Sequence, residues 1–365
     1  MTVRSRDLAC TVVAAVLLAQ PAHARAQAAP VTDADPRVST ADAVDEGLFA
    51  SINGIDQWIT IRGRDRHNPV LLILHGGPGF AMSGQAPVFF DWEKDFTIVQ
   101  WDQPGGGATY AKNHGKDIGP LTLDRYARDG IAVTEFVRHR LGVQKVVLFG
   151  VSWGTQVGLV MAKRRPDLFL AYVGTGQVVS GPRGTLLGYE LALDAARTRQ
   201  DTKAIEALTR VGPPPYKSFE EFAVRQQYTN PPGLPPSPAA VAAYATIAKK
   251  MAAAPPNPRY KGPELSSADA TAAFVTTQHA IYPELVSFEA RDLGMTYSIP
   301  IFVFQGEDDI NTPTVLAREF VQQIEAPAKA FVTIPGAGHV TTAFPAELLE
   351  LLRAYVLPTA RGSAR

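Results

Sequence analysis

A serine, a histidine and a group of acidic residues are the side chains of this sequence best able to do chemistry together. Ser152 lies in GVSWG, the acids Glu307, Asp308 and Asp309 lie in QGEDDINTP, and His339 follows nearer the C-terminal end. A serine hydroxyl becomes a nucleophile near neutral pH only when a base takes its proton and a third group orients that base. The order serine, acid, histidine therefore predicts nucleophilic attack on a carbonyl.

The segment around Ser152 predicts the backbone that such a serine needs. Residues 146–149 form an apolar strand, GVSWG forms one sharp turn, and a helical pattern follows. Gly150 and Gly154 leave room for a strand-to-helix turn that lifts the hydroxyl clear of a sheet. A chance G-x-S-x-G in an ordinary loop is the alternative, but the strand before the turn and the helix after it favour the nucleophile elbow.

His339 is the only one of the seven histidines that lies in the loop after the last predicted strand. It has the chain order and the end of the sheet that a base for Ser152 requires, and a surface loop histidine is the alternative. Glu307, Asp308 and Asp309 directly follow a buried strand, and composition leaves open which of them faces the imidazole. A carboxylate there would fix the imidazole tautomer and stabilise its charged form.

Acyl transfer also needs an oxyanion hole, made of two backbone N–H groups that point at the developing alkoxide. We expect one N–H from Trp153, the residue after the nucleophile, and the other from Gly77 in HGGPG. The glycine-rich segments lack the lysine of a P-loop and do not complete G-x-G-x-x-G, so they do not predict phosphate binding. No metal-ligand spacing such as H-E-x-x-H occurs, and we expect neither a metal nor a cofactor.

The elements that must position these residues alternate between strands and helices. Asn53-Gly54 predicts a hairpin, residues 70–74 and 96–101 are typical of buried parallel strands, and residues 123–140 have apolar residues at helical spacing. The strand pattern stops near residue 179 and returns at residue 299. The sequence thus predicts an α/β catalytic domain over 47–179 and 299–358, with a mostly parallel sheet flanked by helices.

Residues 180–298 differ from the segments on either side of them. Helical stretches replace the strands, and 14 of the 29 prolines of the chain fall here. Because the sheet pattern resumes afterwards, this segment is predicted to be an inserted helical cap. Its aromatic and aliphatic content disfavours the alternative, a disordered linker.

The first 28 residues have the pattern of a secretory signal peptide. Arg4 and Arg6 precede an apolar run over residues 8–19, which is shorter than the roughly 20 residues that span a membrane, and small residues follow as cleavage sites. The only cysteine, Cys10, lies in this segment, so the mature chain would have no disulfide. We expect export to the periplasm or the medium, a loose lead-in over 29–46 and a flexible tail over 359–365.

The composition limits the partners of the protein. An apolar fraction of 46% is that of a soluble globular chain, and a formal net charge of +0 offers nothing to attract nucleic acid or an anionic membrane. We expect no nucleic-acid binding and no stable membrane association after signal cleavage. The expected partner is a small peptide or another small acyl substrate, and the oligomeric state stays open.

Several motifs together resemble the prolyl iminopeptidase family of α/β-hydrolases. These are HGGPG, WDQPGGG, GVSWGT, a G-x-x-D-x-x-x-P segment and a terminal GH, and they cover residues 47–179 and 299–357. The resemblance implies an α/β-hydrolase fold and an aminopeptidase that releases an N-terminal residue, preferably proline. Aligning G-x-x-D-x-x-x-P onto Gly306, Asp309 and Pro313 selects Asp309 as the acid of the triad.

The chain departs from that family at two places. Pro104 stands where the family usually has an arginine after the DQ, so any role of that arginine is absent. The family also recognises a free N-terminal amine through acidic residues of the cap, for which Glu190, Glu284 and Glu289 are the candidates here. Fold and triad therefore transfer more securely than the substrate.

The sequence thus predicts an exported serine hydrolase with a triad of Ser152, His339 and Asp309. Its preferred substrate would be a peptide with a free N-terminus. The first alternative keeps the same machinery and acts on a small ester or a non-peptide amide. The second is a binding protein that retains the fold without catalysis, against which the complete triad argues.

Overall fold

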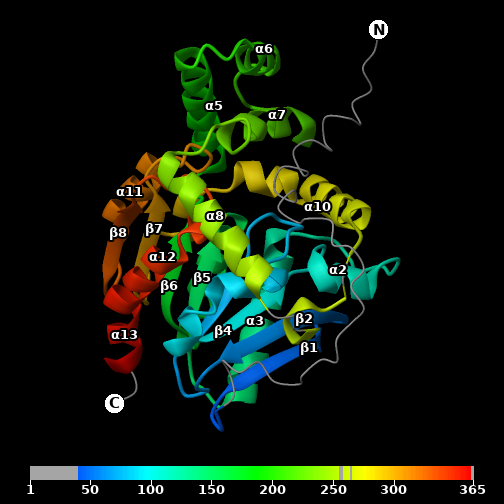
Figure 1. The fold of residues 1–365 in the computed structure, drawn as a ribbon, viewed down its shortest axis with the longest axis vertical. Helices are drawn as coiled ribbons and strands as arrows, with labels where there is room; N and C mark the ends of the chain where they lie inside the picture. Colours follow the sequence, from blue (N-terminus) through cyan, green and yellow to red (C-terminus); the bar gives the residue numbers. More distant parts are fainter. Residues whose placement is uncertain (1–39, 255–257, 264, 363–365) are drawn as a thin grey trace.

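The computed structural model describes residues 40–254, 258–263 and 265–362, and there the chain builds one sheet with helices on both faces (Figure 1). The strands are β1 (Val44–Ile52), β2 (Ile55–Gly63), β3 (Val70–Leu74), β4 (Thr97–Asp102), β5 (Val146–Val151), β6 (Phe169–Thr175), β7 (Ile301–Gly306) and β8 (Lys329–Ile334). Their order is β1-β2-β4-β3-β5-β6-β7-β8. Only the pairs β1 with β2 and β2 with β4 are antiparallel. The predicted mostly parallel α/β architecture is confirmed.

Alternate side chains of the central strands supply two hydrophobic cores, one on each face of the sheet. In β3, Val70, Leu72 and Leu74 belong to one core, and Leu71 and Ile73 belong to the other. All five are at most 1% exposed, which is why this strand is apolar throughout and does not alternate with polar residues. The first core is covered by α3 (Leu123–Leu141), α4 (Trp153–Arg164) and α11 (Thr314–Gln323), and the second by the 3₁₀ helix η2 (Ser83–Phe89), α12 (Pro345–Leu351) and α13 (Leu357–Gly362).

Local signals in the sequence place the ends of the helices. Thr122 caps α3 by accepting a hydrogen bond from the N–H of Arg125, and Gly142 ends it in the left-handed conformation at φ 68°. The short helix α2 (Gly107–Asn113) follows the glycines after β4. Asn53 and Gly54 both have positive φ between β1 and β2, as the predicted hairpin turn requires.

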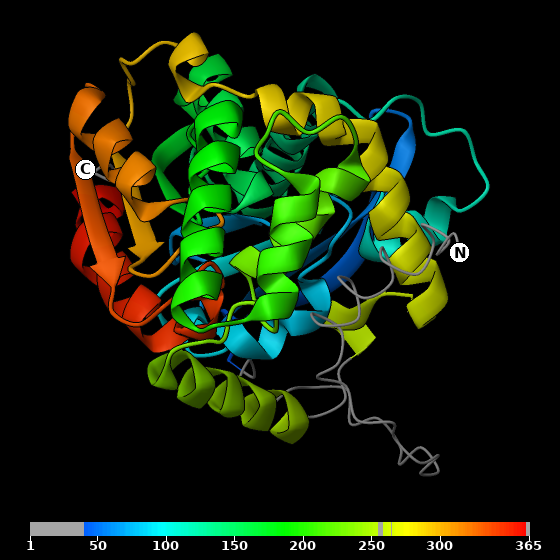
Figure 2. The same cartoon turned by 90° about the horizontal axis from the view of Figure 1, so that it is seen from above.

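The segment between β6 and β7 is helical, and part of it forms a layer at one end of the sheet. It contains α5 (Gly181–Thr198), α6 (Thr202–Val211), α7 (Phe219–Thr229), α8 (Pro238–Ala253), α9 (Pro258–Lys261) and α10 (Ser267–Ser287). Helices α5, α6 and α7 share a small core of their own around Tyr189, Leu208 and Tyr228. Figures 1 and 2 show these three helices beyond the strand ends, with α10 beside them.

Helix α8 leaves that layer and returns to the flank of the sheet. Its residue Ala240 is 2% exposed and belongs to the second core of the catalytic domain. Ser237, the N-cap of α8, donates a hydrogen bond to the carbonyl of Gly336, in the loop that precedes His339. The segment 180–298 is therefore not a separate lid along its whole length, because α8 is part of the support of the catalytic loops.

Two predicted boundaries are corrected by the structure. Strand β1 begins at Val44, inside the segment expected to be a loose lead-in, because Val44 is 3% exposed and belongs to the first core. Helix α13 continues to Gly362, into the segment expected to be a flexible tail, and Ala360 is 7% exposed within it. The predicted signal peptide lies outside the described residues. Within the described part of the chain, no helix is long and apolar enough to cross a membrane.

Candidate active site

The turn between β5 and α4 holds Ser152 in a strained conformation. Its backbone has φ 51° and ψ −117°, a region that costs a non-glycine residue about 1–3 kcal/mol. The two flanking glycines are required by space: a Cβ at Gly154 would lie 2.0 Å from the carbonyl oxygen of Leu74, and one at Gly150 would lie 2.8 Å from that of Gly154. This geometry is that of the predicted nucleophile elbow.

Ser152, His339 and Asp309 lie in one chain of hydrogen bonds. The distance from Ser152 Oγ to His339 Nε2 is 2.9 Å, and the distance from His339 Nδ1 to Asp309 Oδ2 is also 2.9 Å. With Nδ1–H donating to the carboxylate, Nε2 is left as the acceptor for the serine proton. The His339 and Asp309 side chains are 12% and 0% exposed, so the pair is shielded from water.

Four further hydrogen bonds hold the Asp309 carboxylate in place. The N–H groups of Asn311 and Thr312 donate to Oδ1, and Gln305 Nε2 and Thr312 Oγ1 donate to Oδ2 at 2.9 and 2.6 Å. The sequence did not point to Gln305 or Thr312. Gln305 is a polar residue in the otherwise apolar strand β7. The signal that could have pointed to it is its position in the chain, shortly before the three acids.

The structure places Asp309, and neither of its acidic neighbours, against His339. Glu307 and Asp308 are exposed, and the Glu307 carboxylate accepts a hydrogen bond from the N–H of Gly336. Burial and the neighbouring charge of Glu307 raise the pKa of Asp308. The register that composition left open is thus set by the turn after β7.

The loop that starts at His75 is tied to the elbow through Gln103. The N–H of Gln103 donates to His75 Nε2 at 3.0 Å, its Nε2 donates to the His75 carbonyl, and its Oε1 accepts from Trp153 Nε1 at 3.0 Å. Burial lowers the pKa of His75 to about 4, so the ring is neutral, with Nδ1–H donating to the Gly76 carbonyl. His75 is therefore a structural residue of this loop.

Gly77 and Trp153, the two predicted oxyanion donors, both line the pocket beside Ser152. Gly77 has φ 121°, a value that favours glycine, and a Cβ there would lie 2.9 Å from the N–H nitrogen of Phe80. Trp153 is the first residue of α4, so its N–H has no carbonyl one turn earlier in the helix. Both residues thus lie beside Ser152, and the binding of an oxyanion by their N–H groups stays a prediction.

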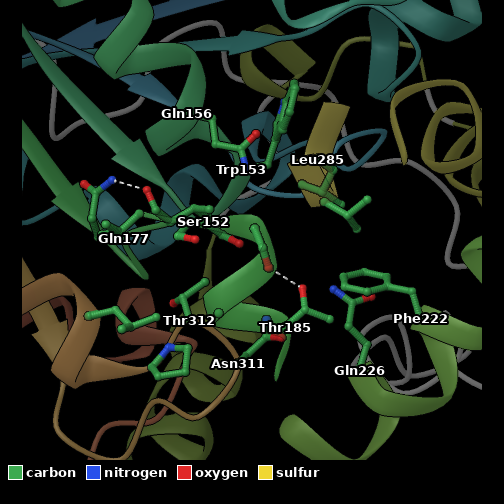
Figure 3. Close-up of a pocket in the computed structure, with 18 of the residues that line it drawn as sticks. Ser152, Trp153, Gln156, Gln177, Thr185, Phe222, Gln226, Leu285, Asn311 and Thr312 are labelled. Carbon is green, nitrogen blue, oxygen red and sulfur yellow. Dashed lines mark hydrogen bonds between the residues drawn. The ribbon is translucent and has the colours of Figure 1, made fainter. Parts of the chain in front are cut away.

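The pocket extends from Ser152 to the cap (Figure 3). It encloses about 580 Å³ of space, a figure that includes its open mouth. Figure 3 shows it between Ser152 and Trp153 on one side and Phe222 and Gln226 of α7 on the other. Leu285, Val286 and Leu316 contribute apolar surface.

The three candidate amine-binding carboxylates are absent from the residues that line this pocket. Glu190 is exposed on α5, Glu284 accepts a hydrogen bond from the N–H of Leu123, and Glu289 accepts one from Ser180 Oγ at 2.6 Å. The structure therefore does not bring them to Ser152. In the described residues, no group of three or more histidine, cysteine or acidic side chains is placed to hold a metal ion.

Comparisons with known proteins agree with this geometry. The chain is 27% identical over 296 residues to the "probable aminopeptidase YbaC" of Bacillus subtilis, which covers 79% of this chain and 89% of that protein. It is 32% identical over 115 residues to the proline iminopeptidase of Neisseria gonorrhoeae, but this match spans only 34% of that protein. The predicted resemblance to proline iminopeptidases is confirmed.

Solved structures share the fold over nearly the whole chain. A proline iminopeptidase-related protein from Thermus thermophilus superposes with a TM-score of 0.58 at 20% identity, covering 87% of this chain and 99% of that one. A sequence profile described as the alpha/beta hydrolase family matches residues 70–351, from the first buried parallel strand into the last helical segment. This match includes the strained serine turn, its histidine and most of the sheet that carries them. The chain therefore belongs to the alpha/beta hydrolase family.

Proposed function

We propose that this protein is a serine hydrolase that cleaves a small ester or amide through an acyl-enzyme. The observation that carries the proposal is the hydrogen-bonded series Ser152, His339, Asp309, whose serine lines a pocket that reaches the cap. Ser152 attacks the scissile carbonyl while His339 accepts its proton, and Asp309 stabilises the imidazolium that forms. The N–H groups of Gly77 and Trp153 bind the oxyanion, His339 returns the proton to the leaving group, and water then releases the acid.

Two substrate classes fit this mechanism, and a separate observation supports each. The similarity to a probable aminopeptidase over most of both chains supports hydrolysis of an N-terminal residue, with proline as the preferred one by resemblance. The pocket supports a small ester or non-peptide amide instead, because a buried free amine requires a nearby carboxylate, and the described residues that line the pocket include no acidic one. We infer that the second class is the better match to the site.

Hydrolysis of a matched set of substrates tests both classes. Wild-type protein and Ser152→Ala are compared on proline p-nitroanilide, N-acetylproline p-nitroanilide and a short acyl p-nitrophenyl ester. We expect ester turnover that Ser152→Ala loses, with kcat/KM at least about tenfold above that for either anilide. Turnover of the free-amine anilide alone would establish an aminopeptidase. Failure of a fluorophosphonate to label Ser152 in folded protein would support a binding protein without catalysis.

We also propose that the protein is exported. The proposal rests on the N-terminal pattern of residues 1–28, which lie outside the described residues. Expression of the full chain in a bacterium, followed by N-terminal sequencing of the periplasmic and medium fractions, tests it. A mature start directly after residue 24, 26 or 28 is expected. Full-length protein confined to the cytosol would contradict it.

A further inference from the structure

Among the described residues that line the pocket beside Ser152, Arg225 is the only charged one. Its side chain lies on α7 and is 2% exposed, and no carboxylate of the described residues lies within 4.0 Å of it. A buried cation without a direct counter-ion is costly, because the low-dielectric interior replaces water around the charge. Such a charge also attracts an anion into the pocket more strongly than a surface charge would.

The guanidinium of Arg225 is held by neutral oxygens. Nη1 donates to Asn311 Oδ1 at 2.8 Å, and Nη2 donates to the carbonyls of Asn311 and Gly184 at 2.8 and 3.2 Å. Its Nε has no hydrogen-bond partner in the described chain. Asp309 is the acid that interacts with Arg225 electrostatically, but its carboxylate already accepts from His339. Burial lowers the pKa of Arg225 to about 10, so the side chain stays charged at neutral pH.

Gln156 is a buried polar side chain of the pocket lining that has no hydrogen-bond partner in the described chain. It lies one helical turn after Ser152 on α4 and is 0% exposed, and neither its amide nitrogen nor its amide oxygen has a hydrogen bond in the described chain. Each such orphan group costs about 1–3 kcal/mol unless a ligand or water satisfies it. Figure 3 shows Gln156 beside Trp153, on the Ser152 side of the pocket. It can therefore bond a polar group near the scissile bond.

The remaining lining of the pocket favours a ligand with a negative charge. The side chains are neutral amides and hydroxyls, such as Gln177, Gln226 and Thr185, or apolar groups, such as Phe222 and Leu285. A substrate ammonium would meet Arg225 as a like charge and find no acid to pair with. A carboxylate would instead gain charge-assisted hydrogen bonds from a cation that is already in place.

We propose that the pocket recognises a substrate that carries a carboxylate a few bonds from the scissile carbonyl, namely a half-ester or half-amide of a small dicarboxylic acid. Arg225 binds the carboxylate, and Gln156 binds a polar group closer to Ser152. The inference rests on the proposed hydrolysis at Ser152, since it names the substrate class of that same site. It follows that a ligand with a carboxylate binds more tightly than the matching neutral amide, and the neutral amide binds more tightly than the matching cation.

Binding to Ser152→Ala protein tests the recognition without any turnover. Three ligands of similar size are titrated by calorimetry: monoethyl glutarate, the ester with a carboxamide in place of the carboxylate, and the ester with a trimethylammonium group there. We expect the carboxylate to bind between about 10-fold and 100-fold more tightly than the carboxamide, as for a charge-assisted hydrogen bond, and the cation to bind weakest. Equal affinities, a preference for the cation, or no binding of the carboxylate at about 10 mM would overturn the proposal.

Variants separate recognition from support of the fold. In the Ser152→Ala background, Arg225→Gln should bring the carboxylate and the carboxamide to within about threefold of each other. Arg183→Gln, which removes an exposed positive charge paired with Glu319, should leave the order unchanged. A purely structural role of Arg225 would weaken all three ligands alike. If Arg225→Gln does not fold, Arg225→Lys serves in its place, because it keeps the charge and should keep the order.

Hydrolysis of the same three esters by wild-type protein is measured separately. If the carboxylate binds best but no ester is hydrolysed, the proposed hydrolase function fails and the recognition stands. If all three esters are hydrolysed with equal kcat/KM, the hydrolase function stands and the recognition fails. The two proposals are therefore distinguishable in one set of experiments.

Discussion

Asp102, at the end of β4, makes the stability of this protein depend on pH in a way that one substitution should reveal. The carboxylate is 1% exposed; Oδ2 accepts hydrogen bonds from Ser83 Oγ and the N–H of Ala108, and Oδ1 has no partner in the described chain. Burial raises the pKa of Asp102 from 3.8 to about 6, against the effect of these hydrogen bonds. We predict that Asp102→Asn changes the pH dependence of the free energy of unfolding.

The sign and size of this change in the free energy of unfolding follow from the pKa values of Asp102 in the folded and the unfolded state. The folded pKa lies above the unfolded one, so the stabilising contribution is fully present below pH 3.8 and is lost as the pH rises through 6. A difference of about two pKa units corresponds to about 3 kcal/mol. Because the asparagine variant does not titrate here, its free energy of unfolding minus that of wild type should increase by about 3 kcal/mol from pH 4 to pH 8.

His75 opposes Asp102 over the same pH range in the wild type. Its pKa is lowered from 6.5 to about 4 by burial, so its contribution to stability is present above pH 6.5 and is lost as the pH falls through 4. The two effects are of similar size, about 3 kcal/mol each, and cancel in large part. Asp102→Asn removes only one of them, and the variant should therefore become the more acid-sensitive protein.

Urea unfolding followed by tryptophan fluorescence, at pH steps from 4 to 8, measures both curves. Urea is uncharged and leaves the ionic strength constant. Glu350→Gln, an equal change on the exposed surface of α12, is the matched control, and its difference from wild type should stay flat. Parallel curves for Asp102→Asn and wild type, within about 0.5 kcal/mol, would refute the reasoning that Asp102 titrates in a buried site.

Two further predictions concern the elbow and its support. Gly154→Ala would place a Cβ 2.0 Å from the Leu74 carbonyl oxygen, a backbone atom that cannot yield, so we expect a loss of about 3 kcal/mol in urea unfolding. Gly84→Ala, where nothing lies within 4 Å, should change stability by less than about 0.5 kcal/mol, and equal effects would contradict the steric argument. Gln103→Leu leaves the buried Trp153 indole N–H without its acceptor, so we expect about 1–3 kcal/mol lost and a lower kcat with little change in KM. An unchanged kcat would show that Gln103 does not position the Trp153 backbone.

The sequence was sufficient to predict the fold and the position of the elbow because both depend on short-range patterns. The apolar runs of β3 and β5 predict a buried parallel sheet by themselves, and G-x-S-x-G predicts a turn too tight for a Cβ. Asp309 needed more than composition, since three acids stand in a row after β7. The resemblance selected it, and the structure shows the turn that directs it, and not Asp308, toward His339.

The supporting residues of the site could not be predicted because their partners are distant in the chain. Gln305 looks like a polar interruption of β7 until the structure shows its amide on Asp309. Gln103 lies in a glycine-rich motif, and only the fold brings it to Trp153, fifty positions away. Hydrogen bonds of this kind are set by tertiary packing, and no periodicity in the sequence records them.

The charge of the substrate pocket is the clearest case of information that exists only in the assembled molecule. The pocket draws on the elbow, the loop after β6, helices α5, α7 and α10, and the loop after β7. The family resemblance implied an amine-binding site, with Glu190, Glu284 and Glu289 of the cap as its candidates. In the fold, Glu284 and Glu289 accept hydrogen bonds outside the pocket lining, and Arg225 is a buried residue of that lining. Under the proposal made above, the catalytic machinery built from short motifs is retained, while the charge preference of the site, which depends on the cap side chains that line it, differs from that of an amine-binding site.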